Sequence, residues 1–269
     1  MFSFAVTAYE ETMPRRMHGQ RILRCLKPAI EHPAIDEIVV VDDGSQDFSQ
    51  LEALLGKAPK LHLYHNEENL GVFGNKVEAI ARCTSDWVVT CDSDNHLPKD
   101  FIDLLANIKL SENVWYCPSF ARPHFDYREL AGVYDLSTIH ELQGLPLAEC
   151  CMNTGNQTVH RESFIEAFAH LRGPRFDLKM ECPMGVPTSR RNGETWRLAW
   201  NACDSLILNA TWLRFGGRMY VMEGLEYDHF RATKDEGNYV RSPREKRLLG
   251  EKLISNLWEE SRSVEPCQE

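Results

Sequence analysis

Ser85-Asp86-Trp87-Val88-Val89-Thr90-Cys91-Asp92-Ser93-Asp94-Asn95 is the stretch from which the rest of the chain can be interpreted. Its apolar and β-branched residues predict a buried strand that ends in two carboxylates separated by one serine. In open α/β sheets, ligands bind at the carboxyl ends of the strands, where Asp92 and Asp94 would lie. Neighbouring carboxylates repel each other unless a cation lies between them, and such oxygen ligands suit Mg²⁺ or Mn²⁺. A lone Asp-x-Asp is more often a pair of solvated turn residues. The choice between a metal site and a solvated turn therefore depends on the pattern of the preceding chain.

The chain before this stretch alternates between strand and helix patterns. We expect strands over 2–7, 35–41 and 61–64, and helices over 20–30, near 51–55 and over 75–82. The second strand ends in Asp42-Asp43-Gly44-Ser45, which is a turn signal because glycine accepts positive φ. This alternation predicts an α/β fold with a mainly parallel sheet flanked by helices.

The pattern after Pro98 is looser. It predicts helices over 100–110, 161–171 and 196–214, strands over 114–117, 153–159 and 218–222, and a polar segment over 223–239. Residues 121–150 have no clear assignment, and the proline-rich segment 173–193 is interpreted as a long functional loop. Ser242-Pro243 begins a final helix. We expect one domain over 1–240, followed by a C-terminal helix and tail over 241–269.

Composition limits the class of protein. The chain has 269 residues and a formal net charge of −10, which argues against a nucleic-acid-binding surface. No apolar run reaches membrane-spanning length, and the N-terminus lacks the pattern of a signal peptide. Nine cysteines are scattered without Cys-x-x-Cys spacing, as is typical of reduced thiols. We therefore expect a cytoplasmic protein without a transmembrane segment; a homo-oligomer is compatible with the sequence.

Four short motifs occur in order: Ser3-Phe4-Ala5-Val6-Thr7-Ala8-Tyr9-Glu10-Glu11, Val41-Asp42-Asp43-Gly44-Ser45, Asn69-Leu70-Gly71 and Asp92-Ser93-Asp94. Together they resemble the motifs of glycosyltransferase family 2, whose members have the GT-A fold. Beyond Asn95 the resemblance is reduced to Thr154-Gly155-Asn156-Gln157, to Asp204 in a helix followed by Gly216-Gly217, and to His229.

The resemblance implies a GT-A (Rossmann-like) fold, with the nucleotide sugar bound by residues 1–110 and the acceptor by residues 111–240. It implies a metal-dependent, inverting transfer of a sugar from a nucleotide-diphosphate sugar to an acceptor hydroxyl, with Mn²⁺ or Mg²⁺ as cofactor. We favour UDP, because an acid near Tyr9 would accept the uracil N–H. Which sugar and which acceptor are used stays open.

The resemblance also implies roles for individual residues. Asp94 would bind the metal, and Asp92 the ribose or the metal through water. Lys76 stands where many relatives carry arginine, and it would bind a phosphate or pair with the nearby acids. The donor site as a whole would comprise Thr7, Tyr9, Glu11, Asp42, Asp43, Asn69, Gly71, Lys76, Asp92, Ser93 and Asp94.

Two further roles carry alternatives. The acceptor hydroxyl needs a base, and by the resemblance that base is Asp204, although Cys203 stands where the family frequently has an acid. The alternative is that Asp204 is a structural carboxylate of the helix, paired with a neighbouring group. His229 is a candidate third metal ligand, or equally a hydrogen-bonded histidine.

Two rival functions share the pattern. A non-catalytic nucleotide-sugar binding protein of the same fold is one, since the acid before Asp204 is missing. A sugar nucleotidylyltransferase is the other, and it is disfavoured because its glycine-rich phosphate loop has no counterpart between Ala8 and Arg16.

Overall fold

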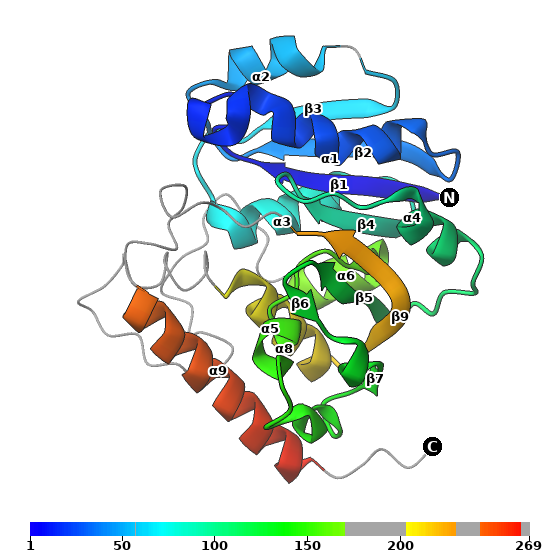
Figure 1. The fold of residues 1–269 in the computed structure, drawn as a ribbon, viewed down its shortest axis with the longest axis vertical. Helices are drawn as coiled ribbons and strands as arrows, with labels where there is room; N and C mark the ends of the chain where they lie inside the picture. Colours follow the sequence, from blue (N-terminus) through cyan, green and yellow to red (C-terminus); the bar gives the residue numbers. More distant parts are fainter. Residues whose placement is uncertain (57, 170–202, 230–242, 265–269) are drawn as a thin grey trace.

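The fold is one mixed sheet with helices on it (Figure 1), seen in a computed structural model that describes residues 1–56, 58–169, 203–229 and 243–264. The strands follow the order β3-β2-β1-β4-β8-β5-β9-β7, and β6 pairs with β5. Their bounds are β1 Phe2–Ala8, β2 Ile35–Asp42, β3 Leu61–His65, β4 Trp87–Asp92, β5 Val114–Arg122, β6 Phe125–Asp126, β7 Gly132–Tyr134, β8 Thr158–His160 and β9 Arg218–Asp228.

The first four strands run parallel and end at the same edge. Ala8 pairs with Asp42, Asp42 with His65, and Thr7 with Asp92, so the carboxyl ends of β1 to β4 are in register. The strands β5 and β9 are parallel to each other, and β8 inserts between β4 and β5 as an antiparallel strand. This topology confirms the predicted mainly parallel sheet, and it brings the polar residues that follow β2 and β4 to one place.

The helices lie in two layers. Their bounds are α1 Gln20–Glu31, α2 Phe48–Leu55, α3 Gly71–Arg82, α4 Lys99–Ala106, α5 Ala148–Met152, α6 Arg161–Phe168, α8 Asp204–Arg214 and α9 Pro243–Ser263. The right-handed crossovers from β1 to β2 and from β3 to β4 run in opposite directions, which puts α1 and α3 on opposite faces of the sheet.

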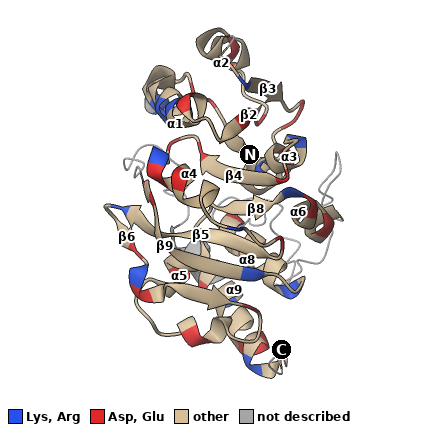
Figure 2. Cartoon of the chain, turned by 90° about the vertical axis from the view of Figure 1, so that its right-hand side faces the viewer, with Lys and Arg blue, Asp and Glu red and all other residues tan. Residues whose placement is uncertain are grey.

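In the view of Figure 2, positive and negative residues are interspersed on α1, α6 and α9. None of the described helices combines the length and apolarity that a membrane crossing requires.

The core of the second half is built on aromatic rings. Trp115 of β5 stacks on Trp212 of α8 with a centroid distance of 4.9 Å, and on Phe164 and Phe168 of α6. The Trp212 indole also donates to the Arg218 carbonyl at 2.9 Å. These contacts fix α8 against the sheet, and with it the position of Asp204.

The structure shifts the ends of several predicted elements. The strand expected to end at residue 222 continues to Asp228, because β5 runs to Arg122 and offers it a partner through Arg122↔Asp228. Gly224, at φ +80°, lies where the register shifts. The helix expected from residue 75 begins at Gly71, the helix expected to residue 110 ends at Ala106, and 121–150 contains β6, β7 and α5. The loop 173–193 and the start of the helix expected over 196–214 lie outside the described residues.

The C-terminal helix packs on the second half. Leu253, Ile254, Leu257 and Trp258 of α9 are buried. Arg214 of α8 forms a bidentate ion pair with Glu260, and His140 bonds to Ser261. The predicted helix after Pro243 is therefore part of the packed structure.

Gly217→Ala is expected to destabilise the fold, because an added Cβ would lie 2.0 Å from the Trp212 ring, which its stack on Trp115 prevents from moving. Overpacking of this kind lowers the free energy of unfolding by about 1–3 kcal/mol, measurable by urea denaturation. Gly250→Ala in α9 is the control, since its nearest contact would be an ordinary 3.5 Å to Cys203. Equal stability of the two variants would contradict this account.

Candidate functional site

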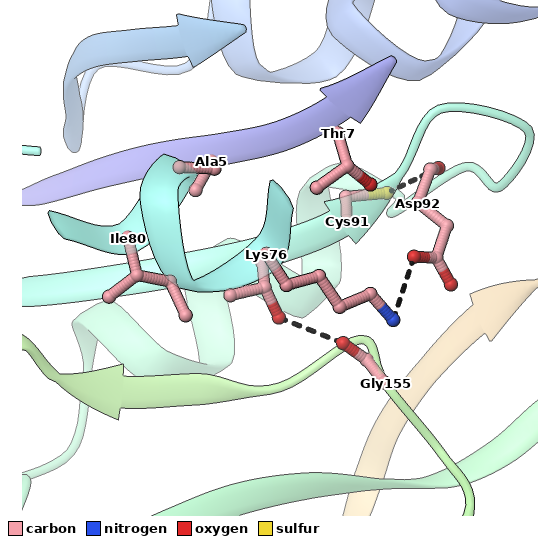
Figure 3. A pocket seen from close by; sticks show the side chains of 9 residues that line it. Ala5, Thr7, Lys76, Ile80, Cys91, Asp92 and Gly155 are labelled. Carbon is pink, nitrogen blue, oxygen red and sulfur yellow. Dashed lines mark hydrogen bonds and ion pairs between the residues drawn. The ribbon is translucent and has the colours of Figure 1, made fainter. Parts of the chain in front are cut away.

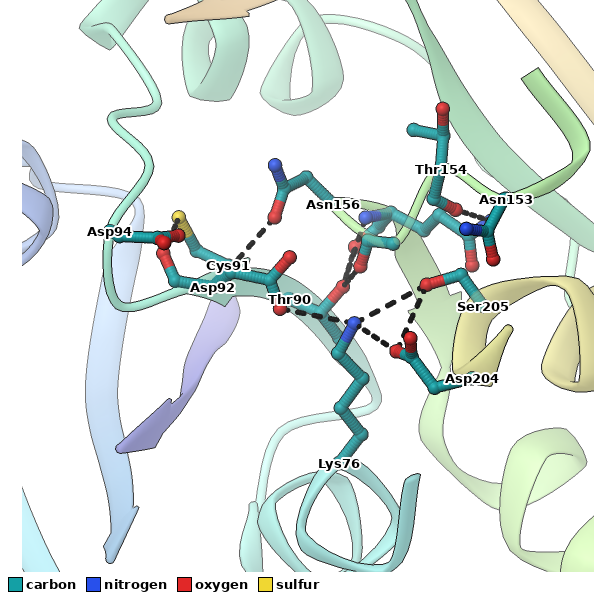
Figure 4. A network of polar contacts seen from close by, with 12 residues as sticks. Lys76, Thr90, Cys91, Asp92, Asp94, Asn153, Thr154, Asn156, Asp204 and Ser205 are labelled. Carbon is teal, nitrogen blue, oxygen red and sulfur yellow. Dashed lines mark hydrogen bonds and ion pairs between the residues drawn. The ribbon is translucent and has the colours of Figure 1, made fainter. Parts of the chain in front are cut away.

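The turn after β4 is held by the loop that precedes β8. The Asp92 backbone N–H donates to the Asn156 side chain at 2.9 Å, and the Thr90 hydroxyl donates to the Gly155 carbonyl at 2.9 Å. The Asn95 backbone N–H donates to the Asp92 carbonyl. Asp92 and Asp94 therefore stand on a fixed backbone at the carboxyl edge of the sheet (Figure 4).

Lys76 is the centre of the polar network in Figure 4. Its ammonium contacts Asp92 Oδ1 at 3.0 Å, Asp204 Oδ2 at 2.7 Å and Ser205 Oγ at 3.3 Å. Only 6% of Lys76 is exposed. Burial would lower the pKa of Lys76, but the Asp204 and Asp92 carboxylates outweigh burial and leave the pKa raised. The lysine is charged, and it joins β4 to α8.

Glycine is required where the loop passes Lys76. A Cβ on Gly155 would lie 2.5 Å from the Lys76 nitrogen and 2.4 Å from the Ser205 hydroxyl. Figure 3 shows Lys76, Asp92 and Gly155 lining a small pocket, together with Thr7 and Ala5 of β1. The loop can approach this closely only because residue 155 has no side chain.

Asp204 is the first residue of α8 and is 8% exposed. A carboxylate at a helix N-terminus is stabilised by the helix dipole. The Leu206 backbone N–H of this first turn donates to the Asn153 side chain at 3.0 Å. The side-chain contacts of Asp204 with Lys76 and Ser205 both involve Oδ2.

Asp94 is influenced by the carboxylate of Asp92 and by a second cation of the site, Arg16. The Arg16 guanidinium contacts Asp94 Oδ2 at 3.3 Å. Burial and the Asp92 carboxylate raise the pKa of Asp94, and Arg16 opposes the rise. Glu11 is fully buried and accepts from the Ser93 hydroxyl at 2.6 Å, while its Oε2 has no hydrogen-bond partner. Burial raises the pKa of Glu11, and Arg16 again opposes the rise.

The two acids after β2 are engaged within the protein. Asp42 accepts from the Ser45 backbone N–H at 2.9 Å and from the Ser45 hydroxyl, and it contacts the His65 ring at 2.8 Å. Asp43 Oδ1 accepts from the Leu70 backbone N–H at 2.8 Å. Burial raises the pKa of Asp43 to about 6. Asp42 therefore shapes the turn, whereas Asp43 can change charge near neutral pH.

The remaining residues of the predicted donor site lie around this edge. The Asn69 amide donates to the Asp43 carbonyl at 2.9 Å and accepts from the Gly71 backbone N–H at 3.1 Å. Gly71 has a φ of +77° at the start of α3. Tyr9 is 38% exposed and lies directly after β1. The structure thus collects the predicted residues of the first half at one sheet edge, while their roles as ligands stay predictions.

His229 follows β9 and contacts aromatic rings. Its ring lies 5.4 Å from Phe125 and 5.8 Å from His124, and its backbone N–H donates to the Arg122 carbonyl. The preceding residue, Asp228, pairs with His96 just after the Asp-Ser-Asp turn. The role of His229 as a metal ligand stays a prediction.

Several residues of the site are not predicted by the sequence motifs. Arg16 lies in a short 3-10 turn, Pro14–Gly19, and only folding places it at Asp94. No sequence motif points to Ser205. Gly155 and Asn156 belong to the short motif Thr154-Gly155-Asn156-Gln157, which does not by itself predict their contacts. The Pro14-Arg15-Arg16 cluster directly after a motif strand was the one available signal for Arg16.

The arrangement can bind a cation and an anion together. Asp92 and Asp94 supply carboxylate oxygens, and Lys76 and Arg16 supply positive charge beside them. Among the residues that the structure describes, no group of three or more His, Cys, Asp or Glu side chains could hold a metal alone. A metal here would therefore take its other ligands from a bound phosphate and water, which is common for Mg²⁺.

Comparison with known proteins supports the fold and identifies a family. The profile described as Glycosyl transferase family 2 matches residues 3–164. Solved structures of TarS from S. aureus are similar: TarS 1-349 has a TM-score of 0.53 and 15% identity, covering 97% of this chain and 70% of that one. TarS 1-349 in complex with UDP-GlcNAc has a TM-score of 0.54 and 16% identity, covering 95% and 66%. The chain spans 42% of a longer TarS structure. No curated protein matches by sequence.

Lys76→Met is expected to destabilise the protein, because it leaves Asp204 and Asp92 without their shared cation. Removing one partner of a buried ion pair costs about 3–5 kcal/mol in unfolding free energy, measurable by urea denaturation. The double variant Lys76→Met/Asp204→Asn should recover part of the loss. A double variant no more stable than the single one would show that the ion pair is not the cause.

Proposed function

Because this chain belongs to glycosyl transferase family 2, we propose that it transfers a sugar from UDP to an acceptor hydroxyl, with Mn²⁺ or Mg²⁺ and with inversion at the anomeric carbon. The observation that carries the proposal is the Asp92–Lys76–Asp204 network, which sets the Asp-Ser-Asp turn opposite a carboxylate at a helix N-terminus. The UDP and UDP-GlcNAc complexes of TarS support a nucleotide-sugar donor.

The residues fit a divalent metal. Asp94 would be the ligand, with Asp92 binding directly or through water, and diphosphate oxygens completing the shell. A metal bound there would stabilise the negative charge that develops on the leaving diphosphate. Lys76 holds Asp92 in place beside it.

The acceptor side is assigned to Asp204. Lys76 and Ser205 hold its Oδ2, so we assign Oδ1 to the proton of the attacking hydroxyl. We also propose that residues 1–110 bind the donor and residues 111–240 the acceptor, because the motifs lie in the first part and Asp204 enters from the second. A non-catalytic sugar-nucleotide binding protein is the alternative that experiment must separate.

The test is turnover of a UDP-sugar in the presence of Mn²⁺, followed as release of UDP. EDTA should abolish release and Mn²⁺ or Mg²⁺ should restore it. Asp94→Ala should lose donor binding while keeping the wild-type unfolding curve. Full activity of metal-stripped protein would refute metal dependence, and donor binding without any release would favour the non-catalytic alternative.

Asp204→Asn should lower kcat by roughly 10²–10⁴-fold, the usual contribution of a positioned general base. The amide oxygen can still accept from Lys76, so fold and donor Kd should hold. Cys203→Ala is the matched control at the adjacent position and should have little effect on kcat. The transfer rate at saturating donor, measured together with the donor Kd, shows whether Asp204 acts as the base. A near-normal rate for Asp204→Asn would place the base elsewhere.

UDP affinity should fall as the pH is lowered through about 6, the pKa of Asp43. Above that pH the charged carboxylate accepts the uracil N–H strongly; below it, the protonated group is a weaker, neutral acceptor. Calorimetry from pH 5 to pH 8 measures the effect, and Asp43→Asn should flatten it, whereas Asp36→Asn on the exposed face of β2 should not. Tight binding of a purine diphosphate in place of UDP would contradict this assignment.

A further inference from the structure

The two carboxylates of the Asp-Ser-Asp turn are paired with cations of this chain in unequal ways. Lys76 is buried and contacts three oxygen atoms, on Asp92, Asp204 and Ser205. Arg16 makes one contact with Asp94, at 3.3 Å, and 23% of the Arg16 side chain is exposed. Charge-assisted hydrogen bonds are usually shorter, at about 2.7–2.9 Å. The cation at Asp94 is therefore the looser of the two.

Arg16 has a second acceptor nearby. Its charge acts on Glu11 as well as on Asp94, so the guanidinium lies close to both carboxyl groups. Glu11 is fully buried, and its Oε2 has no hydrogen-bond partner. A guanidinium carries five N–H donors, and the contact with Asp94 uses one of them. Arg16 can therefore leave Asp94 without losing every carboxylate partner.

The backbone around Arg16 is strained and locally bonded. Met17 and His18 have φ values of 55° and 52°, a left-handed conformation that residues with a side chain rarely adopt in succession. The Arg16 backbone N–H donates to the Met13 carbonyl, within the same segment. Half of Met17 is exposed. Residues 14–19 can therefore shift without breaking pairs of the sheet.

We propose that Arg16 is an exchangeable counter-ion of Asp94, which neutralises this carboxylate in the metal-free protein and leaves it when a divalent cation binds. The inference rests on the metal-dependent function proposed above. Lys76 stays with Asp92 and Asp204, because its three contacts are internal and buried. Arg16 thereby sets the metal affinity of the site and couples metal binding to the position of residues 14–19.

The test is Mn²⁺ binding to nucleotide-free protein, measured by the electron paramagnetic resonance signal of free Mn²⁺. Arg16→Ala and Arg16→Gln remove the charge of Arg16, while Arg21 still acts on Asp94, and they should bind Mn²⁺ about five- to tenfold more tightly than wild type. Arg16→Lys should stay near wild type. Arg24→Ala is the matched control, since the ion pair of Arg24 is with Asp228. Added salt should reduce the difference.

Unchanged or weaker Mn²⁺ affinity in both Arg16→Ala and Arg16→Gln overturns the proposal; if the alanine variant fails to fold, the glutamine variant decides. UDP release from the donor is measured in parallel. If wild type and variants all release UDP but none binds Mn²⁺, the exchange is wrong and the transferase function stands. If Mn²⁺ affinity follows the expected order without UDP release, the exchange stands and the transferase function is wrong.

Discussion

The structure depends on one buried ammonium group. Lys76 comes from α3 in the first half of the chain, and Asp204 comes from α8, 128 residues later. Asp204 could not be buried beside Asp92 without the lysine, because like charges in a poorly solvated site repel strongly. The ion pair therefore fixes where α8 meets the sheet, and it fixes the distance between the turn acids and Asp204.

The ion pair of Lys76 with Asp204 is part of a closely packed region. The loop before β8 passes Lys76 at Gly155, and it also bonds to the Asp92 backbone through Asn156. Near the other end of α8, the stack of Trp212 on Trp115 holds the helix against β5. Packing of the apolar core and placement of the charged site are thus parts of one arrangement. A shift in either would move Asp204 away from Lys76.

Charges alternate along the edge of the sheet. Carboxyl groups of Glu11, Asp94, Asp92 and Asp204 are interleaved with the cations Arg16 and Lys76. The protein therefore offsets part of the charge of its own acids before any ligand arrives. A donor that carries a diphosphate and a metal brings both signs of charge to such an edge, so it can replace internal pairs with its own.

The sequence by itself determined the parallel sheet, the turns at Asp42 and Asp92, and the family, because these depend on local periodicity and on short motifs whose residues are adjacent in the chain. It also singled out Lys76 and Asp204. Only the tertiary structure decided that Lys76 joins Asp204 to Asp92, that Arg16 lies at Asp94, and that β9 continues to Asp228 along β5. These are contacts between residues far apart in the chain, and they arise from packing and charge pairing that no local pattern encodes.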